Sequence, residues 1–260
     1  MLIRTEATDI GLVRPVNEDS YICLDSAVYV VADGMGGHAA GEVASALLTQ
    51  TAKEILEGLG PDDITEALLR QVVLEANRRI LAKAEGDNIY NGMGTTASLL
   101  CLKEQQAVWA HVGDSRIYLL HEGKLQQITK DHSLVWDLVE NGSITPEEAQ
   151  QHPKRNLLTR AVGVDEDLLV DTGAFPIVAG DKFLLCSDGL NGMLADDDTV
   201  SIGSRGVCYA KRTLEVLDRI GCDNRFVDKG VSWDVGRTFF GEGEVSTSTC
   251  ARRPSTCAPA

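Results

Sequence analysis

The sequence predicts an α+β protein in which antiparallel sheets are covered by helices on their outer faces. The chain has 260 residues and 43% of them are hydrophobic, which is enough for one large domain with a buried core. Two helical segments follow one another early in the chain, and three strand-like segments follow them in turn. Strands that succeed one another without helices between them argue against a doubly wound parallel sheet.

Each element has its own local signal. Residues 27–32 form a β-branched run that ends at Asp33, which predicts a buried strand. Apolar residues at helical spacing predict helices over residues 41–59 and 64–84, separated by a Gly-Pro-Asp-Asp break. Further strands are expected at residues 95–102, 107–112, 116–120, 168–175 and 182–186.

Residues 1–200 are predicted to form the main domain, with an insertion at about residues 132–165. This insertion is polar and helix-prone, and such segments often form mobile flaps. Residues 201–260 carry nine Lys or Arg and seven Asp or Glu, against 15 and 32 in the first 200. We therefore expect residues 201–245 to be a divergent C-terminal part of the domain and 246–260 a disordered tail. Either a flexible tail or a change of reading frame would explain this change in charge composition.

The formal net charge of −15 argues against nucleic acid and anionic membranes as partners. The N-terminus lacks the basic and apolar regions of a signal peptide, and no stretch reaches the roughly 18 apolar residues of a membrane span. We expect a monomer located in the cytoplasm.

The chain has seven cysteines and no close pair of them, which argues against a zinc site. Cys23, Cys101 and Cys186 lie in apolar, strand-like runs, and we expect them to be buried thiols.

Acidic residues stand beside strand ends, three of them next to glycine. The four segments are Asn17-Glu18-Asp19, Ala32-Asp33-Gly34, Gly113-Asp114-Ser115 and Ser187-Asp188-Gly189. Each alone is typical of a turn. Together they predict carboxylates that converge at one rim of a sheet, where they would repel one another unless a cation lay between them. Oxygen ligands without His or Cys favour Mg²⁺ or Mn²⁺.

These segments resemble the PPM-type (type 2C) protein serine/threonine phosphatases in their compact bacterial form. The matching stretches cover about three quarters of the chain, in family order: GLVRPVNEDS at 11–20, VADGMGGHAAGEVAS at 31–45, GMGTTAS at 92–98, AHVGDSRIY at 110–118, ITKDHSLV at 128–135 and LLCSDGL at 184–190. The resemblance implies a four-layer αββα sandwich of two antiparallel sheets flanked by helices.

The resemblance also implies a ligand set for Mn²⁺ or Mg²⁺, with two ions at the core site and a third, weaker one in bacterial members. Asp33 would bridge the two core ions, the Gly34 carbonyl would bind the second and Asp188 the first. Asp114, with Asp188, matches the third position.

Three more residues match catalytic positions of the family. Asp19 matches an outer acid that orients metal-bound water, Arg14 the arginine that grips the substrate phosphate, and His38 the general acid. Thr95 and Thr96 look like structural support for the rim. Outside the motif, Arg14 would be a solvated charge and His38 a loop or capping histidine. His111 and His132 are expected to pack as polar residues near the rim.

Elementary chemistry agrees with these roles. Two cations about 3.5–4 Å apart lower the pKa of a shared water, which gives hydroxide at neutral pH. The planar fork of Arg14 can hold two phosphate oxygens, and His38 can protonate the leaving serine or threonine oxygen. No covalent intermediate is needed, so Cys186 and Ser187 are not expected to be nucleophiles.

The resemblance weakens at the C-terminus, where the family has one more metal-binding aspartate followed by a central strand. Only Gly221-Cys222-Asp223-Asn224 matches that aspartate's turn, and Arg225 to Gly230 do not read as a core strand. Asp223 is either the remaining ligand or a coincidence in a replaced tail. In the second case activity or stability would be impaired.

Two functions follow from the sequence. The first is metal-dependent hydrolysis of phosphoserine and phosphothreonine on proteins. This activity would oppose a serine/threonine kinase, and the kinase and its substrates are the expected partners. The second is a degenerate phosphatase that binds phosphoproteins with little or no turnover. A phosphodiesterase is a weaker third, because the acidic body would repel nucleic acid.

Overall fold

The structure, a computed structural model, describes residues 4–10, 14–36, 40–191, 235–240 and 243–249. They belong to two units: Thr8–Asp196, and Met1–Ala7 together with Asp197–Ala260. The sequence had suggested a boundary near residue 200. The first unit holds every element from β1 to α5.

The helices and strands of the first unit are as follows: β1 Asp19–Leu24, β2 Val28–Met35, α1 Ala40–Leu56, a 3₁₀ turn Pro61–Asp63, α2 Glu66–Gly86, a 3₁₀ turn Asn88–Tyr90, β3 Gly94–Thr95, β4 Ala97–Leu102, β5 Gln106–Val112, β6 Arg116–His121, β7 Lys124–Gln127, α3 Leu134–Glu140, α4 Pro146–Gln151, β8 Asp171–Pro176, β9 Lys182–Cys186 and α5 Asp188–Asn191.

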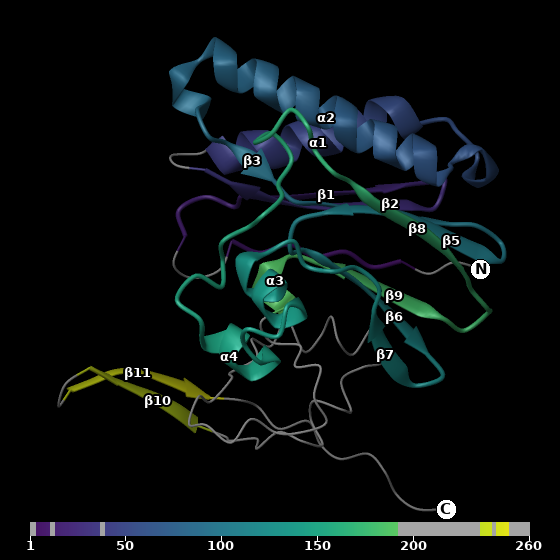
Figure 1. Cartoon of the computed structure of the whole chain (residues 1–260). Coiled ribbons are helices and arrows are strands. Elements are labelled where there is room, and N and C mark those ends of the chain that lie inside the picture. Colours follow the sequence, from purple (N-terminus) through teal and green to yellow (C-terminus); the bar gives the residue numbers. More distant parts are fainter. Residues whose placement is uncertain (1–3, 11–13, 37–39, 192–234, 241–242, 250–260) are drawn as a thin grey trace, which may run out of the picture. The chain divides into compact units, whose positions relative to one another are not determined.

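Two antiparallel sheets organise this unit (Figure 1). The larger sheet has the order β1-β2-β4-β5-β8, with β3 paired to β2, and the smaller has the order β7-β6-β9. Every strand pair in both sheets is antiparallel. The predicted α+β architecture of antiparallel sheets with helices outside is confirmed.

Two apolar clusters hold the layers together. Helices α1 and α2 cover one face of the larger sheet (Figure 1). Their buried side chains, such as Leu48 and Val72, pack with Val30 and Leu99 of the sheet. The second cluster joins the two sheets and contains Leu100, Ile117, Trp109, Phe175 and Phe183. Burial of these side chains stabilises a helix–sheet–sheet stack. Residues 192–234 lie outside the described residues, so no layer is assigned to them.

The element boundaries differ from the predicted ones where local chemistry intervenes. The single strand expected at 95–102 is divided at Thr96, whose N–H donates to the Asp33 carbonyl while its hydroxyl bonds the Asp33 N–H and Ser115. Strand β8 begins at Asp171 and not at 168. Strand β7, with the sequence KLQQ, was not predicted, because it lacks the β-branched and aromatic residues that mark strands.

The insertion between β7 and β8 contains two short, well-capped helices. The Ser133 hydroxyl accepts a hydrogen bond from the Trp136 backbone N–H at the start of α3. At α4 Thr145 and Glu148 form a reciprocal capping box with Pro146 in the first turn. Isolated bridges, Thr95 to Val162 and Ser133 to Leu158, tie the insertion to the body and to itself.

The second unit contains a hairpin of β10, Val235–Phe240, and β11, Gly243–Thr249. Residues 246–249, expected to be disordered from their composition, therefore lie in a strand. Residues 250–260 lie outside the described residues. Within the described ranges, no helix is long and apolar enough to cross a membrane.

Candidate active site

Strands β1 and β2 bring the first two acidic residues together. Asp19 and Asp33 are direct partners in the antiparallel register. The Asp33 backbone is fixed from the other side, because its N–H donates to Thr96 Oγ1 at 2.9 Å and its carbonyl accepts from Thr95 Oγ1 at 3.0 Å. Both threonines are buried. The rim support expected of Thr95 and Thr96 is thus visible as hydrogen bonds to the main chain of Asp33.

Gly34 lies where the backbone of β2 meets the start of α1. A Cβ at this position would lie 2.0 Å from the carbonyl oxygen of Gly41 and 2.7 Å from that of Glu18. The Gly34 amide also donates to the Glu18 carbonyl at 3.0 Å. Only glycine fits here, and the close packing fixes the main chain directly after Asp33.

The loop between β5 and β6 supplies Asp114. Gly113 adopts φ +108°, and a Cβ there would lie 2.6 Å from Thr96. Ser115, on the other side of Asp114, is buried, and its hydroxyl bonds Thr96 Oγ1 at 2.7 Å. Thr96 therefore joins the backbone of Asp33 to the loop that carries Asp114.

Residues that follow β9 reach the same place from the smaller sheet. Ser187 Oγ donates to Asp19 Oδ2 at 2.7 Å. The backbone N–H of Asp188 hydrogen-bonds the carboxylate of Asp33. Residues separated by more than 150 positions in the sequence thus meet at the rim, and Asp33 and Asp188 lie together.

Burial and mutual repulsion raise the pKa values of three of these carboxyls. The pKa of Asp33 rises to about 8, first because of desolvation and then because of the charges of Asp19, Asp188 and Asp114. Desolvation, followed by the charges of Asp188 and Asp131, raises the pKa of Asp114 to about 7. The pKa of Asp19 is also raised, mainly by burial, although the Ser187 hydrogen bond opposes the shift.

The donor chemistry fits a hard divalent cation. Several carboxylates and carbonyls are held close together on a fixed backbone, and a positive charge would relieve their repulsion. In the part of the chain that the structure describes, no three His, Cys, Asp or Glu side chains form an assembled metal cage. The rim thus presents converging oxygens and not a closed set of side-chain ligands.

Arg14 approaches the rim from the segment before β1. Its Nη1 forms a 2.8 Å ion pair with Glu18 Oε2, while the side chain stays 61% exposed. The Arg14 charge opposes part of the rise that burial causes in the pKa of the neighbouring Asp19. An exposed guanidinium beside the carboxylates is free to exchange Glu18 for another anion. The sequence placed Glu18 in an acidic segment but gave it no role of its own.

His38 and Asp223 lie outside the described residues. The general-acid role of the first and the ligand role of the second stay predictions from the sequence.

Two further groups of polar residues lie behind Asp114, and sequence reasoning gave no role to the first of them. Arg116 binds Asp131 through Nε and Nη2, at 2.9 and 2.8 Å. His111 and His132 are buried beside each other, with ring centroids 5.1 Å apart. Their burial agrees with the expected polar packing. The DHS tripeptide at 131–133 was a signal that could have connected these residues to the rim.

The thiols show no sign of nucleophilic activation. Burial raises the pKa of Cys101 to about 11 and that of Cys186 to about 12. Cys23 is only half-buried, contrary to the expectation for all three. The other four cysteines lie outside the described residues.

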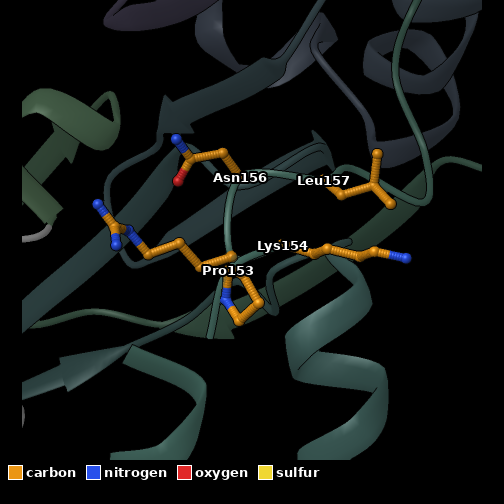
Figure 2. Close-up of a pocket in the computed structure, with 5 residues that line it drawn as sticks. Pro153, Lys154, Asn156 and Leu157 are labelled. Atoms are coloured by element: carbon orange, nitrogen blue, oxygen red, sulfur yellow. The ribbon is translucent and has the colours of Figure 1, made fainter. Parts of the chain in front are cut away.

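The insertion carries a surface pocket of about 430 Å³ directly after α4 (Figure 2). Its lining residues are Pro153, Lys154, Arg155, Asn156 and Leu157. Both basic side chains are exposed, and neither forms an ion pair with another described residue. In a chain with a net charge of −15, these two side chains are a local concentration of positive charge.

Comparisons with known proteins show the family of the chain. The family model described as "Protein phosphatase 2C" matches residues 16–218. The chain belongs to the protein phosphatase 2C family.

Individual members of the family match over most of the chain. The serine/threonine phosphatase stp of Listeria monocytogenes is 42% identical over 215 residues, which are 80% of this chain and 83% of that protein. The crystal structure of the serine/threonine phosphatase PstP/Ppp of Mycobacterium tuberculosis superposes with a TM-score of 0.68 at 37% identity, covering 83% of this chain and 84% of that one. The PstP catalytic domain in complex with two manganese ions gives a TM-score of 0.66 at 36% identity, covering 84% and 85%.

Proposed function

We propose that this chain is a metal-dependent hydrolase of phosphoserine and phosphothreonine on proteins. The carrying observation is the convergence of Asp19, Asp33, Asp114 and Asp188 at one rim, with Arg14 beside them. Relatives named serine/threonine phosphatases support the same activity. The paired carboxylates and the adjacent guanidinium favour turnover over phosphoprotein binding without catalysis.

The metal assignment follows from the ligand chemistry and from the manganese ions of the PstP structure. Asp33, the Gly34 carbonyl and Asp188 would hold two Mn²⁺ or Mg²⁺ ions, with Asp114 and Asp188 at a third position and Asp223 completing the first. Bound ions of this kind supply activated water and neutralise the phosphate charge.

The other residues act on the substrate and on protons. Arg14 releases Glu18 and takes two oxygens of the phosphoryl group through its planar fork. Asp19, fixed by Ser187, orients the attacking water through its carboxylate. His38 gives a proton to the serine or threonine oxygen as the ester bond breaks.

The substrates that we propose are phosphorylated proteins in the cytoplasm, including a serine/threonine kinase and the proteins it modifies. The pocket at residues 153–157 places basic side chains on the insertion, where they suit acidic residues that flank the phosphorylated one. The acidic surface disfavours nucleic acid and anionic membranes, and we propose that the chain works as a monomer.

The test is hydrolysis of p-nitrophenyl phosphate and of a phosphothreonine peptide by the full chain. We expect release of phosphate with Mn²⁺ and its loss with excess chelator. Asp33→Asn should abolish both reactions. Phosphate release that persists in excess chelator would refute the metal-dependent mechanism, and tight phosphopeptide binding without turnover would favour the non-catalytic alternative.

A further inference from the structure

Two buried histidines hold the peptide group of Gly113, the residue before Asp114. The Gly113 N–H donates to His132 Nδ1 at 3.1 Å, and the Gly113 carbonyl accepts from the His132 backbone N–H at 2.8 Å. His111 Nε2 lies 3.0 Å from the same carbonyl. Both polar groups of one glycine are therefore fixed by residues from two different segments.

The partners define the proton on each ring. His132 Nδ1 accepts from Gly113, so its Nε2 carries the hydrogen and donates to Asp171 Oδ2 at 3.1 Å. His111 Nε2 faces the carbonyls of Gly113 and Lys130, both at 3.0 Å, and therefore carries its hydrogen there. Its Nδ1 accepts from Ser98 Oγ at 3.0 Å. Each ring nitrogen thus has one assigned role, which fixes both ring orientations.

Asp171 and Arg160 in turn orient His132. Arg160 Nη1 donates to Asp171 Oδ1 at 2.9 Å, while the other carboxylate oxygen holds the imidazole. Asp171 opens strand β8, whereas Arg160 belongs to the insertion. Hydrogen bonds therefore connect the insertion, through the Asp171 carboxylate and the His132 imidazole, to the backbone of the loop between β5 and β6, here called the rim loop.

Gly113 needs these hydrogen bonds from His111 and His132, because its own backbone is not restricted. Glycine at φ +108° has little intrinsic preference that would fix the direction of the next residue. Asp114 follows at once, and its carboxylate lies among those of Asp33 and Asp188. Without external hydrogen bonds, rotation at Gly113 would turn this carboxylate away from the rim.

We propose that His132, oriented by Asp171 and Arg160, is a positioning residue for Asp114 that orders the rim loop and the insertion together. The inference rests on the proposed function, because it assigns Asp114 to the metal site. It adds to that function a physical link between the insertion and the weakest metal position.

The test compares His132→Ala with His132→Asn in the full chain. Asparagine keeps an oxygen near the position of Nδ1, so it can still accept the Gly113 N–H, whereas alanine cannot. Hydrogen exchange of the amides in residues 112–116 reports the hydrogen bonds of Gly113 directly. We expect exchange at Gly113 to rise about tenfold in the alanine variant and to return most of the way in the asparagine variant.

Calorimetric titration with Mn²⁺ is the second readout. Loss of a hydrogen bond behind a metal ligand weakens binding about 10–100-fold, so the weakest Mn²⁺ equilibrium should weaken by this factor in His132→Ala. In an Asp114→Asn background the same substitution should change Mn²⁺ binding less than about twofold, since the residue it positions is already gone. His121→Ala, which removes an exposed histidine paired with Asp181 at 2.7 Å, is the matched control and should change neither readout.

Unchanged Mn²⁺ binding in His132→Ala, or equal effects with and without the Asp114 carboxylate, would overturn the inference. Faster exchange spread evenly over α1 and β4 would also overturn it, since that would indicate general destabilisation. Absence of Mn²⁺ binding by the wild-type chain would instead refute the proposed function, while the exchange measurement would still report whether His132 holds Gly113.

Discussion

Asp33 joins the structural and the proposed chemical roles of the rim in one residue. Its main chain completes hydrogen bonds to Thr95 and Thr96, while its carboxyl lies among three like charges. The backbone contacts hold the side chain in place against repulsion that would otherwise drive it outward. The two roles are separable, because substitution of the carboxyl alone leaves the main-chain bonds intact.

Asp33→Asn should therefore remove activity without weakening the fold. We expect a fall of about a thousandfold in Mn²⁺-dependent hydrolysis, equivalent to ~4 kcal/mol of transition-state stabilisation. In chelator at pH 8 the midpoint of thermal unfolding should stay equal or rise, because a repelled carboxylate has become neutral. Asp62→Asn, at an exposed turn, is the control and should change neither value. A variant that keeps a tenth of the activity would contradict the bridging role.

Thr96 offers the opposite case, a residue whose loss should act through stability. Thr96→Val keeps the volume but removes the hydroxyl that accepts the Asp33 N–H and bonds Ser115. Leaving buried polar groups without partners costs about 1–3 kcal/mol. Urea unfolding should show this loss, and Thr96→Ser should recover most of it. Equal stability of the valine and wild-type chains would show that these bonds do not hold the rim.

At the scale of the element, strands and helices with strong periodicity were predictable and the connections between them were not. The β-branched run before Asp33 and the repeating apolar positions of α2 placed those elements within a few residues. The KLQQ strand carries no such signal and depends on pairing with β6. The glycines next to Asp33, Asp114 and Asp188 indicated the rim, because glycine lets another part of the backbone approach closely.

The hidden part of the site consists of contacts between distant residues. His132 and Asp171 are 39 positions apart, and Ser187 and Asp19 are 168 apart. Each residue alone has an ordinary surface or packing interpretation, and only the fold brings the pairs together. A single sequence does not reveal which distant residues are in contact unless a family motif indicates it.

The insertion yields a prediction about substrate choice. Lys154→Glu combined with Arg155→Glu reverses the charge of the pocket after α4. We expect kcat/KM for a phosphopeptide with flanking acidic residues to fall about tenfold, since each exposed charge contributes up to ~1 kcal/mol. Hydrolysis of p-nitrophenyl phosphate should change less than about twofold. Lys124→Glu on β7, which changes the net charge by half as much, is the control for charge reversal away from the pocket. Parallel losses on both substrates would place the effect at the rim and not in the pocket.

At the scale of the whole molecule, the acidic rim makes stability depend on pH and on metal together. A carboxyl whose pKa is raised in the folded protein stabilises it while protonated, and this stabilisation is lost as pH rises through the folded value. For Asp33 and Asp114 the folded values are about 8 and about 7, against an ordinary value of 3.8. Without metal, the chain should therefore lose stability between about pH 4 and pH 8.

Divalent metal competes with protons for the same oxygens, so its stabilising effect should grow over that range. We expect the difference in unfolding temperature between Mn²⁺ and chelator to be about 5 °C larger at pH 8 than at pH 6, which corresponds to ~2 kcal/mol for a chain of this size. In Asp33→Asn the dependence on pH should shrink, because one of the two titrating carboxyls is gone. A difference that is constant with pH, or larger at pH 6, would mean that these carboxyls do not bind the metal.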